Sequence, residues 1–194
     1  MRRAPVPRLV LASASPRRLA LLRQIGIEPD AVDPAHLDEL SWPRQRPGEL
    51  AGALAAAKAA EVAARHPNCF VLGADTVVAL GRRVLPKAED ADRARDCLMR
   101  LSGRRHRVHG GLSVHAPGGR TASRLVETVV AFKRLEAAEI DAYLAHGEWR
   151  GKAGGYAIQG RAAAFVRRIN GSYSNVVGLP LHETVALLTG LGYR

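Results

Sequence analysis

Asp75 is the carboxylate in this sequence whose surroundings point most strongly to chemistry. It lies within the apolar run VLGADTVV (71–78), which is typical of a buried strand. An ionised carboxylate is costly to bury unless it is paired, bound to a cation or used in a reaction. The structural alternative is a strand-end aspartate that accepts hydrogen bonds from backbone amides. Together with Glu39, Asp75 could hold a hard divalent cation, with water and a polyphosphate supplying the other ligands.

Four basic side chains could offset the charge of such a polyphosphate. Lys58 lies near the middle of an alanine-rich segment, and Lys87 follows a strand end. Arg17 and Arg18 fall in the first turn of a predicted helix, where the helix dipole is already positive. Two guanidinium groups at that place favour a bound anion, and phosphate is the anion that they suit. The alternative is that these lysines and arginines simply extend into solvent.

A glycine-rich segment, GKAGGYAIQG (151–160), would let the backbone approach a ligand closely. Within it, Gln159 offers both a donor and an acceptor for reading the edge of a base. The sequence contains neither the P-loop pattern nor the Rossmann glycine pattern. His106 and His109 lie three positions apart on a predicted strand, so they face opposite sides and do not suit a shared zinc ion.

The arginine pair is presented by the segment LASASPRRLALLRQIG (11–26), which begins as a strand and turns directly into a helix. Ser15 suits the helix N-cap, Pro16 the first helical position and Gly26 the C-terminal end. Because Ser13 and Ser15 lie where a helix cap is expected, we do not expect a serine nucleophile.

The remaining elements alternate between helix and strand. The apolar periodicity predicts helices at 49–66, 89–101, 135–146 and 180–188, and strands at 70–80, 84–85, 107–115, 124–132 and 163–169. The strands at 107–115 and 124–132 flank a glycine turn and form a long antiparallel hairpin. With 194 residues, the chain is expected to form one domain or two small lobes around a mixed α/β sheet.

Composition narrows the class of protein. A net charge of +11 and a pI near 10.7 suggest nucleic-acid binding. The basic pairs are scattered, however, and aromatic residues make up only 5%, too few for a base-stacking platform, so anionic small molecules are the expected partners. Cys69 and Cys97 are predicted to be buried free thiols. A cytoplasmic protein is expected, since no run is apolar over about 18 residues and the amino terminus does not match a secretory signal.

Taken together, these motifs resemble the Maf-type nucleoside triphosphate pyrophosphatases, and their combination resembles the dTTP/UTP branch more than the 7-methyl-GTP branch. The blocks that carry the resemblance are LASASPRR, Asp38-Glu39, Lys58-Ala59, GADTVV, LSGRRHRV, KAGGYAIQG and GSYSNVVGLPLHE. The resemblance implies a single domain over 1–194, with an elongated mixed sheet flanked by helices and two lobes around a central cleft, as in ITPase-like folds. It also implies hydrolysis of a nucleoside triphosphate to the monophosphate and pyrophosphate by water attack at the α-phosphorus.

Residue roles follow from the same resemblance. Asp75 corresponds to the general base, and Lys58 and Lys87 to groups that handle phosphate during catalysis. Glu39 and Asp75 are the implied ligands of a divalent metal, Mg²⁺ or Mn²⁺. Arg17, Thr76 and Gln159 match positions that separate the branches of the family. The full implied substrate-binding set is Ser13, Arg17, Arg18, Thr76 and Gln159.

The chain departs from the family pattern at two places. The family usually has Gly-Lys-Pro around the second lysine, whereas this chain has Pro86-Lys87-Ala88. A threonine is usual after the HxV motif, where this chain has His109-Gly110-Gly111. The competing functions are a basic nucleic-acid-binding module and an interaction protein that regulates division, since the family has been linked to septation control. The resemblance also admits a homodimer and modified pyrimidine nucleotides as substrates.

Overall fold

The structure is a computed structural model, and it describes residues 8–37 and 45–194. Within these residues the central sheet has seven strands in the order β2-β1-β3-β6-β7-β9, with β4 paired to β3. The strands of this sheet are β1 (Leu9–Ala12), β2 (Ala31–Val32), β3 (Phe70–Leu80), β4 (Arg83–Leu85), β6 (Arg105–His115), β7 (Thr121–Phe132) and β9 (Val166–Asn170).

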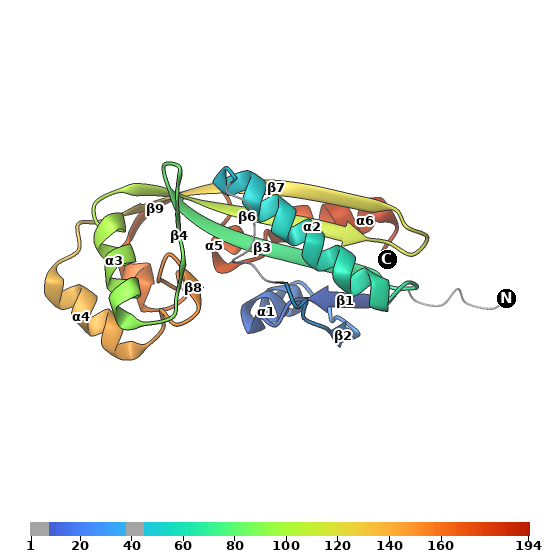
Figure 1. Cartoon of the computed structure of the whole chain (residues 1–194), viewed down its shortest axis with the longest axis horizontal. Coiled ribbons are helices and arrows are strands. Elements are labelled where there is room, and N and C mark those ends of the chain that lie inside the picture. The colour runs from blue at the N-terminus through green and yellow to red at the C-terminus, as the bar shows by residue number, and fades with distance from the viewer. Residues whose placement is uncertain (1–7, 38–44) are drawn as a thin grey trace.

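The sheet is mixed, as predicted. β1 runs parallel to both β2 and β3, whereas β3, β6, β7 and β9 pair antiparallel in succession. The long strands β3, β6 and β7 extend through most of the molecule and connect its two ends (Figure 1). The predicted hairpin turn between β6 and β7 is present, and Gly118 and Gly119 both adopt the positive φ angles that favour glycine there.

Helices cover the sheet on both faces. The helices are α1 (Pro16–Gln24), α2 (Pro47–Arg65), α3 (Ala91–Leu101), α4 (Ala137–His146), α5 (Tyr173–Val177) and α6 (Leu181–Leu191), with a 3₁₀-helix, η2, at Arg161–Phe165. α2 packs on the face that carries Gly73 and Gly111. The opposite face, with Leu72 and Leu112, belongs to the same apolar cluster as Leu188 of α6. The two layers therefore enclose the long strands between them.

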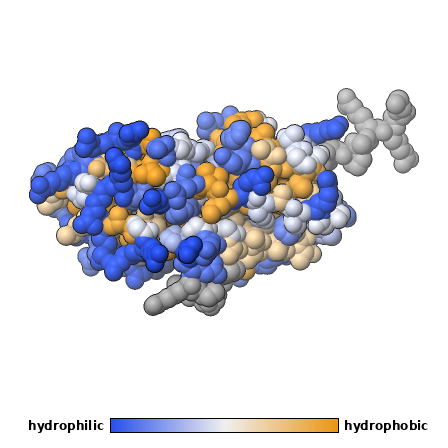
Figure 2. All heavy atoms as spheres, turned by 90° about the horizontal axis from the view of Figure 1, so that it is seen from above, coloured by the Kyte–Doolittle hydropathy of each residue, from blue (hydrophilic) through white to orange (hydrophobic). Residues whose placement is uncertain are grey.

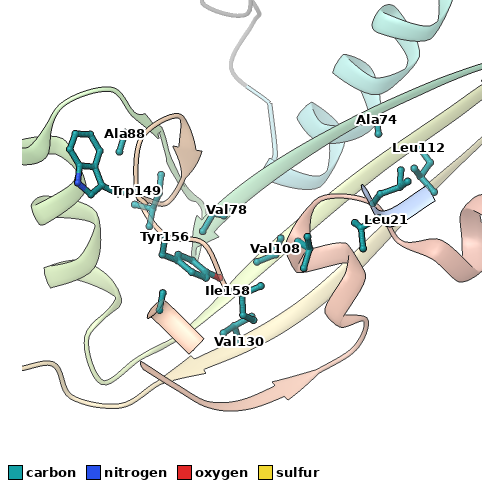
Figure 3. Close-up of a cluster of buried hydrophobic side chains, with 14 of the residues drawn as sticks. Leu21, Ala74, Val78, Ala88, Val108, Leu112, Val130, Trp149, Tyr156 and Ile158 are labelled. Atoms are coloured by element: carbon teal, nitrogen blue, oxygen red, sulfur yellow. The ribbon is translucent and has the colours of Figure 1, made fainter. Parts of the chain in front are cut away.

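One end of the molecule is a smaller lobe built on α3, α4, η2 and a separate two-stranded sheet (Figure 1). That small sheet pairs β5 (Lys87–Ala88) antiparallel with β8 (Lys152–Ala153). Figure 3 shows how the glycine-rich segment packs on the large sheet, with Tyr156 and Ile158 beside Val108 and Val130. The smaller lobe thus shares one apolar core with the central sheet.

Hydrophilic side chains gather over the end formed by α3 and α4 (Figure 2). Several arginines at this end lie against carboxylates: Arg95 Nη2 contacts Asp141 Oδ1 at 2.5 Å, and Arg100 Nε contacts Asp96 Oδ2 at 2.7 Å. Part of the excess positive charge is therefore offset locally. Within the described ranges, no helix combines the length and the apolar character that crossing a membrane requires.

Two local predictions were wrong. The strand predicted at 163–169 begins only at Val166, because the alanine-rich stretch before it forms η2. Ser15 occupies the N-cap of α1, as predicted, but its side chain makes no capping hydrogen bond. Instead, the Ser15 amide donates to Oγ of Ser13 at 3.2 Å. The other predicted helices and strands are present, with ends shifted by a few residues.

Candidate active site

Asp75 and Lys58 form a mostly buried ion pair at the centre of the molecule. Asp75 lies in the middle of β3 and is only 4% exposed. Lys58 reaches it from α2, with 2.6 Å between Nζ and Oδ1. The carboxylate is thus neither a strand-end group nor held by backbone amides alone, because a cation on another element compensates its charge. Removing one partner of such a pair leaves a buried charge, which costs about 3–5 kcal/mol.

Two glycines of the sheet allow α2 to approach closely enough to make this pair. A Cβ atom built at Gly73 would lie 2.7 Å from Cβ of Ala59, and one built at Gly111 would overlap the α2 backbone. The facing side chains of α2 are alanines, which require little space. The small residues on α2 and on the sheet therefore keep the helix close enough to the sheet for Lys58 to reach Asp75.

Arg18 links three segments around the same point. Its Nη1 donates to Oγ of Ser13 at 2.9 Å, and its Nη2 donates to Oγ1 of Thr76 at 3.2 Å. Its Nε donates to the carbonyl oxygen of Gly178 at 2.8 Å. The end of β1, the start of α1, the middle of β3 and the segment after α5 are thereby held together. Ser13 and Thr76, both predicted to bind substrate, are held beside Asp75 by this guanidinium.

Positive charges converge at the start of α1. Burial lowers the pKa of the Arg17 guanidinium, and the nearby charge of Arg18 lowers it further. Burial likewise lowers the pKa of the Lys152 ammonium, and the charge of Arg17 adds to this shift. Cations brought this close to one another in a partly desolvated place favour a bound anion.

Opposite the sheet, the small β5–β8 ladder forms a ribbon that carries Lys87. The backbone amide of Gly151 donates to the carbonyl of Ala88 at 2.8 Å, and that of Gly154 donates to the carbonyl of Pro86 at 3.1 Å. Lys87 is exposed on this ribbon. The Pro86 carbonyl is therefore part of the contact that joins β5 to the glycine-rich segment.

A cavity of about 280 Å³ lies between these two groups of residues. One side, the sheet wall, consists of Ser13, Arg18, Lys58, Asp75 and Thr76. The other side, the ribbon wall, consists of Lys87, Lys152 and Gln159. Arg17 also lines the cavity, which brings together all the predicted site residues except Glu39. Glu39 and its neighbour Asp38 lie outside the described residues.

Sequence comparison identifies the family. A profile of the family described as Maf-like protein matches residues 8–191. This chain belongs to the Maf family.

Curated Maf relatives match along nearly the whole chain. Proteins from Rhodospirillum rubrum and Paramagnetospirillum magneticum are both 64% identical to it, over 96% and 95% of this chain and 89% and 97% of theirs. A protein from Caulobacter vibrioides is 60% identical over 97% of both chains. All three are named dTTP/UTP pyrophosphatase.

Among solved structures, a HAM1 protein from Coxiella burnetii matches with a TM-score of 0.50 at 17% sequence identity. The match covers 95% of this chain and 99% of that chain. At this identity the likeness concerns the fold alone, and it confirms the predicted mixed α/β architecture.

One departure from the Maf pattern has a visible packing reason. A Cβ atom built at Gly110 would overlap the amide oxygen of Asn175, which is completely buried. The Asn175 amide nitrogen donates to the carbonyls of Val108 and Val126 at 3.2 and 3.3 Å and to Oγ1 of Thr128 at 3.0 Å. Asn175 therefore fastens α5 to the β6–β7 hairpin through the space that a threonine at position 110 would fill.

Lys152 is the cavity residue that the sequence analysis missed. In this segment the sequence pattern predicts roles only for the glycines and for Gln159. A basic residue within a glycine-rich segment was the available signal, because a lysine placed where the backbone can approach a ligand is well placed to contact it.

The cavity suits a hard cation that shares its ligands with a phosphorylated substrate. Within residues 8–37 and 45–194, no group of three or more His, Cys, Asp and Glu side chains could hold a metal ion by itself. Mg²⁺ is commonly bound by one or two carboxylates together with substrate phosphates and water. Asp75 provides a carboxylate of this kind, facing a space lined by cations that suit phosphate.

Proposed function

We propose that this protein is a nucleoside triphosphate pyrophosphatase that hydrolyses dTTP and UTP to the monophosphate and pyrophosphate. The observation that carries the proposal is the Asp75–Lys58 pair, a buried carboxylate that opens onto a cavity whose other charged residues, among those the structure describes, are all cations. One basic oxygen among many positive groups suits activation of water beside a highly charged substrate. Membership of the Maf family and the names of its relatives support the same activity.

Asp75 is proposed as the general base. Lys58 holds Oδ1, so that Oδ2 can accept a proton from a water molecule directed at the α-phosphorus. The water oxygen forms a bond to the α-phosphorus as the bond to the β-phosphate bridging oxygen breaks. Pyrophosphate leaves with that electron pair.

Charge on the triphosphate is offset by Lys58, Lys87 and Arg18, which lie around the cavity from three different elements. Because phosphoryl transfer needs little covalent help, positioning and electrostatics supply most of the rate. Arg18 contributes to positioning directly, since its bonds to Ser13 and Thr76 hold both hydroxyl groups in place.

The proposed cofactor is Mg²⁺ or Mn²⁺, held by Asp75 and the phosphate oxygens, with Glu39 as a further ligand predicted from the sequence. When bound, the metal supplies additional charge neutralisation at the phosphates.

Base selectivity is assigned to Gln159 with Arg17 and Thr76. Gln159 is exposed in the ribbon wall, where its amide can donate to and accept from a pyrimidine edge. A pyrimidine altered away from that edge would meet the same contacts, which is the basis for expecting modified pyrimidine nucleotides as substrates. A role in division control, a cytoplasmic location and a homodimer stay predictions from the resemblance.

A panel of canonical and modified nucleoside triphosphates, incubated with Mg²⁺ or Mn²⁺, tests the function. We expect UTP and dTTP to yield the monophosphate and pyrophosphate faster than purine nucleotides do. Release of orthophosphate would place attack at the γ-phosphorus and contradict the reaction class. Salt-sensitive DNA binding without nucleotide hydrolysis would favour the nucleic-acid-binding alternative.

A further inference from the structure

Lysine is scarce in this chain, and its distribution is uneven. Of the 29 lysines and arginines, only four are lysines: Lys58, Lys87, Lys133 and Lys152. Three of them line the cavity, and the fourth, Lys133, is ion-paired with Glu139 at 2.5 Å. A chain that otherwise uses arginine for its positive surface therefore places lysine mainly at one site.

Lys152 belongs to the same rigid unit as Lys87. In the β5–β8 ladder, Lys87 pairs with Ala153 and Ala88 pairs with Lys152. The two lysines therefore lie on adjacent strands and leave the ribbon on opposite faces, yet both line the cavity at its edge. The Lys152 side chain is half-buried, and its Nζ donates to the backbone carbonyl of Arg150 at 3.0 Å. A phosphate oxygen could replace that neutral acceptor and form a stronger, charge-assisted bond.

The environment of the Lys152 ammonium differs from that of Lys58. Among the described residues, no carboxylate oxygen lies within ion-pair distance of its Nζ. Glu148, whose negative charge acts on Lys152, accepts a hydrogen bond from the Arg161 amide at 2.8 Å. Arg17 is close enough for its positive charge to act on Lys152. This contrasts with Lys58, which Asp75 compensates.

These observations select the part of the substrate that Lys152 contacts. A nucleobase is neutral and would leave the charge of Lys152 uncompensated. The α-phosphate must lie near Asp75 on the sheet wall for water to reach it. The β- and γ-phosphates carry most of the negative charge, and a lysine ammonium on a flexible stem suits such a ligand as a point charge.

We propose that Lys152, acting with Lys87 on the adjacent strand, binds the two phosphates that leave as pyrophosphate. This proposal rests on the proposed function, since it takes a nucleoside triphosphate as the substrate. The ribbon then functions as a cationic clamp on the leaving group, separate from the water-activating pair on the sheet wall.

Calorimetric titration with inorganic pyrophosphate and, separately, with UMP tests this assignment. In Lys152→Gln we expect the dissociation constant for pyrophosphate to rise about tenfold, with little change for UMP. Lys152→Arg should retain most of the pyrophosphate affinity, because it retains the charge. Lys133→Gln, which removes the same charge outside the cavity, is the matched control and should behave as wild type.

Each other outcome contradicts the assignment. Unchanged pyrophosphate affinity in folded Lys152→Gln, or an equal loss in Lys133→Gln, would remove Lys152 from the phosphate site. A selective loss of UMP binding would assign it to the nucleoside instead. Melting temperatures of the variants establish that they fold. The function is tested independently, because pyrophosphate that binds to a wild-type protein unable to hydrolyse UTP would contradict the activity and not the anion site.

Discussion

The two walls of the cavity differ in how deeply their side chains are buried. On the sheet wall, Asp75, Lys58 and Arg18 are fixed by bonds of 2.6 to 3.2 Å to side chains and backbone of other elements. On the ribbon wall, Lys87 and Gln159 are exposed and Lys152 is half-buried, and hydrogen bonds hold the backbone of the ladder.

This difference separates two tasks within one site. Groups that are fixed before substrate arrives need no reorganisation during the reaction, which suits the activation of water. An exposed glutamine such as Gln159 keeps its rotational freedom until a ligand orders it, and exposed lysines can adjust to the position of an anion, which suits capture and selection. We therefore expect changes in the sheet wall to affect the chemical step and stability, and changes in the ribbon wall to affect affinity and selectivity.

The largest effect is expected from Asp75→Asn on the sheet wall. The substitution is nearly isosteric but removes the proposed base, so kcat for UTP should fall about 10³-fold while the protein remains folded. Pyrophosphate release and circular dichroism measure the two quantities. Wild-type turnover in this variant would contradict the assignment of Asp75 and the division of tasks between the walls.

Stability offers a direct comparison of two lysines. Lys58→Met should lower the free energy of unfolding by about 3–5 kcal/mol, because it leaves the buried Asp75 carboxylate without its cation. Lys87→Met, on the exposed ribbon, should change it by no more than about 0.5 kcal/mol. Urea unfolding of both variants provides the measurement. Equal losses would show that the difference in burial between the two walls does not affect stability.

The junction between the two walls should be sensitive to acid. Nε2 of His106, on β6, lies 2.8 Å from the hydroxyl oxygen of Tyr156 in the glycine-rich segment. Burial lowers the pKa of His106 to about 4. The unfolded chain binds this proton below about pH 6.5, whereas the folded protein does not bind it until about pH 4. Above about pH 6.5 the titration of His106 therefore does not lower the free energy of unfolding. Between about pH 6.5 and pH 4 this free energy falls as the pH decreases, because only the unfolded chain takes up the proton.

At pH 5 the titration of His106 lowers the free energy of unfolding by about 2 kcal/mol relative to pH 7. Urea unfolding at the two pH values should show a smaller decrease for His106→Gln than for wild type. Burial also lowers the pKa of His109 and of His115, so part of the decrease persists in the variant. Identical decreases in variant and wild type would show that His106 is not the group responsible.

The smallest effect is expected from Gln159→Ala on the ribbon wall. The preference for UTP over purine nucleotides, as a ratio of kcat/KM values, should fall roughly tenfold, because a hydrogen-bonding contact to the base is lost. Turnover at saturating UTP should change little, since Asp75 and Lys58 are untouched. An unaltered preference would assign base selection to Arg17 or Thr76.

Local patterns in the sequence determined most of the elements. Alternating or continuous apolar runs predicted β3 and the β6–β7 hairpin, and a proline and a glycine marked the two ends of α1. These signals are local, because hydrophobic period and turn geometry depend on neighbouring residues. The strand prediction was wrong at residues 163–165, because their apolar side chains fit a buried strand or a helical turn equally well.

The sequence also established which groups carry unusual charge: a carboxylate in an apolar strand and two arginines at a helix start. Only the tertiary structure decided their partners. Lys58 meets Asp75 because Gly73 lets α2 lie close to the sheet, and Arg18 reaches the Gly178 carbonyl across 160 positions of sequence. The pairing of β8 with β5 then brings the segment with Lys152 to the cavity. These contacts depend on strand pairing and on the close packing of segments that are distant in sequence. A local sequence pattern does not determine either of them.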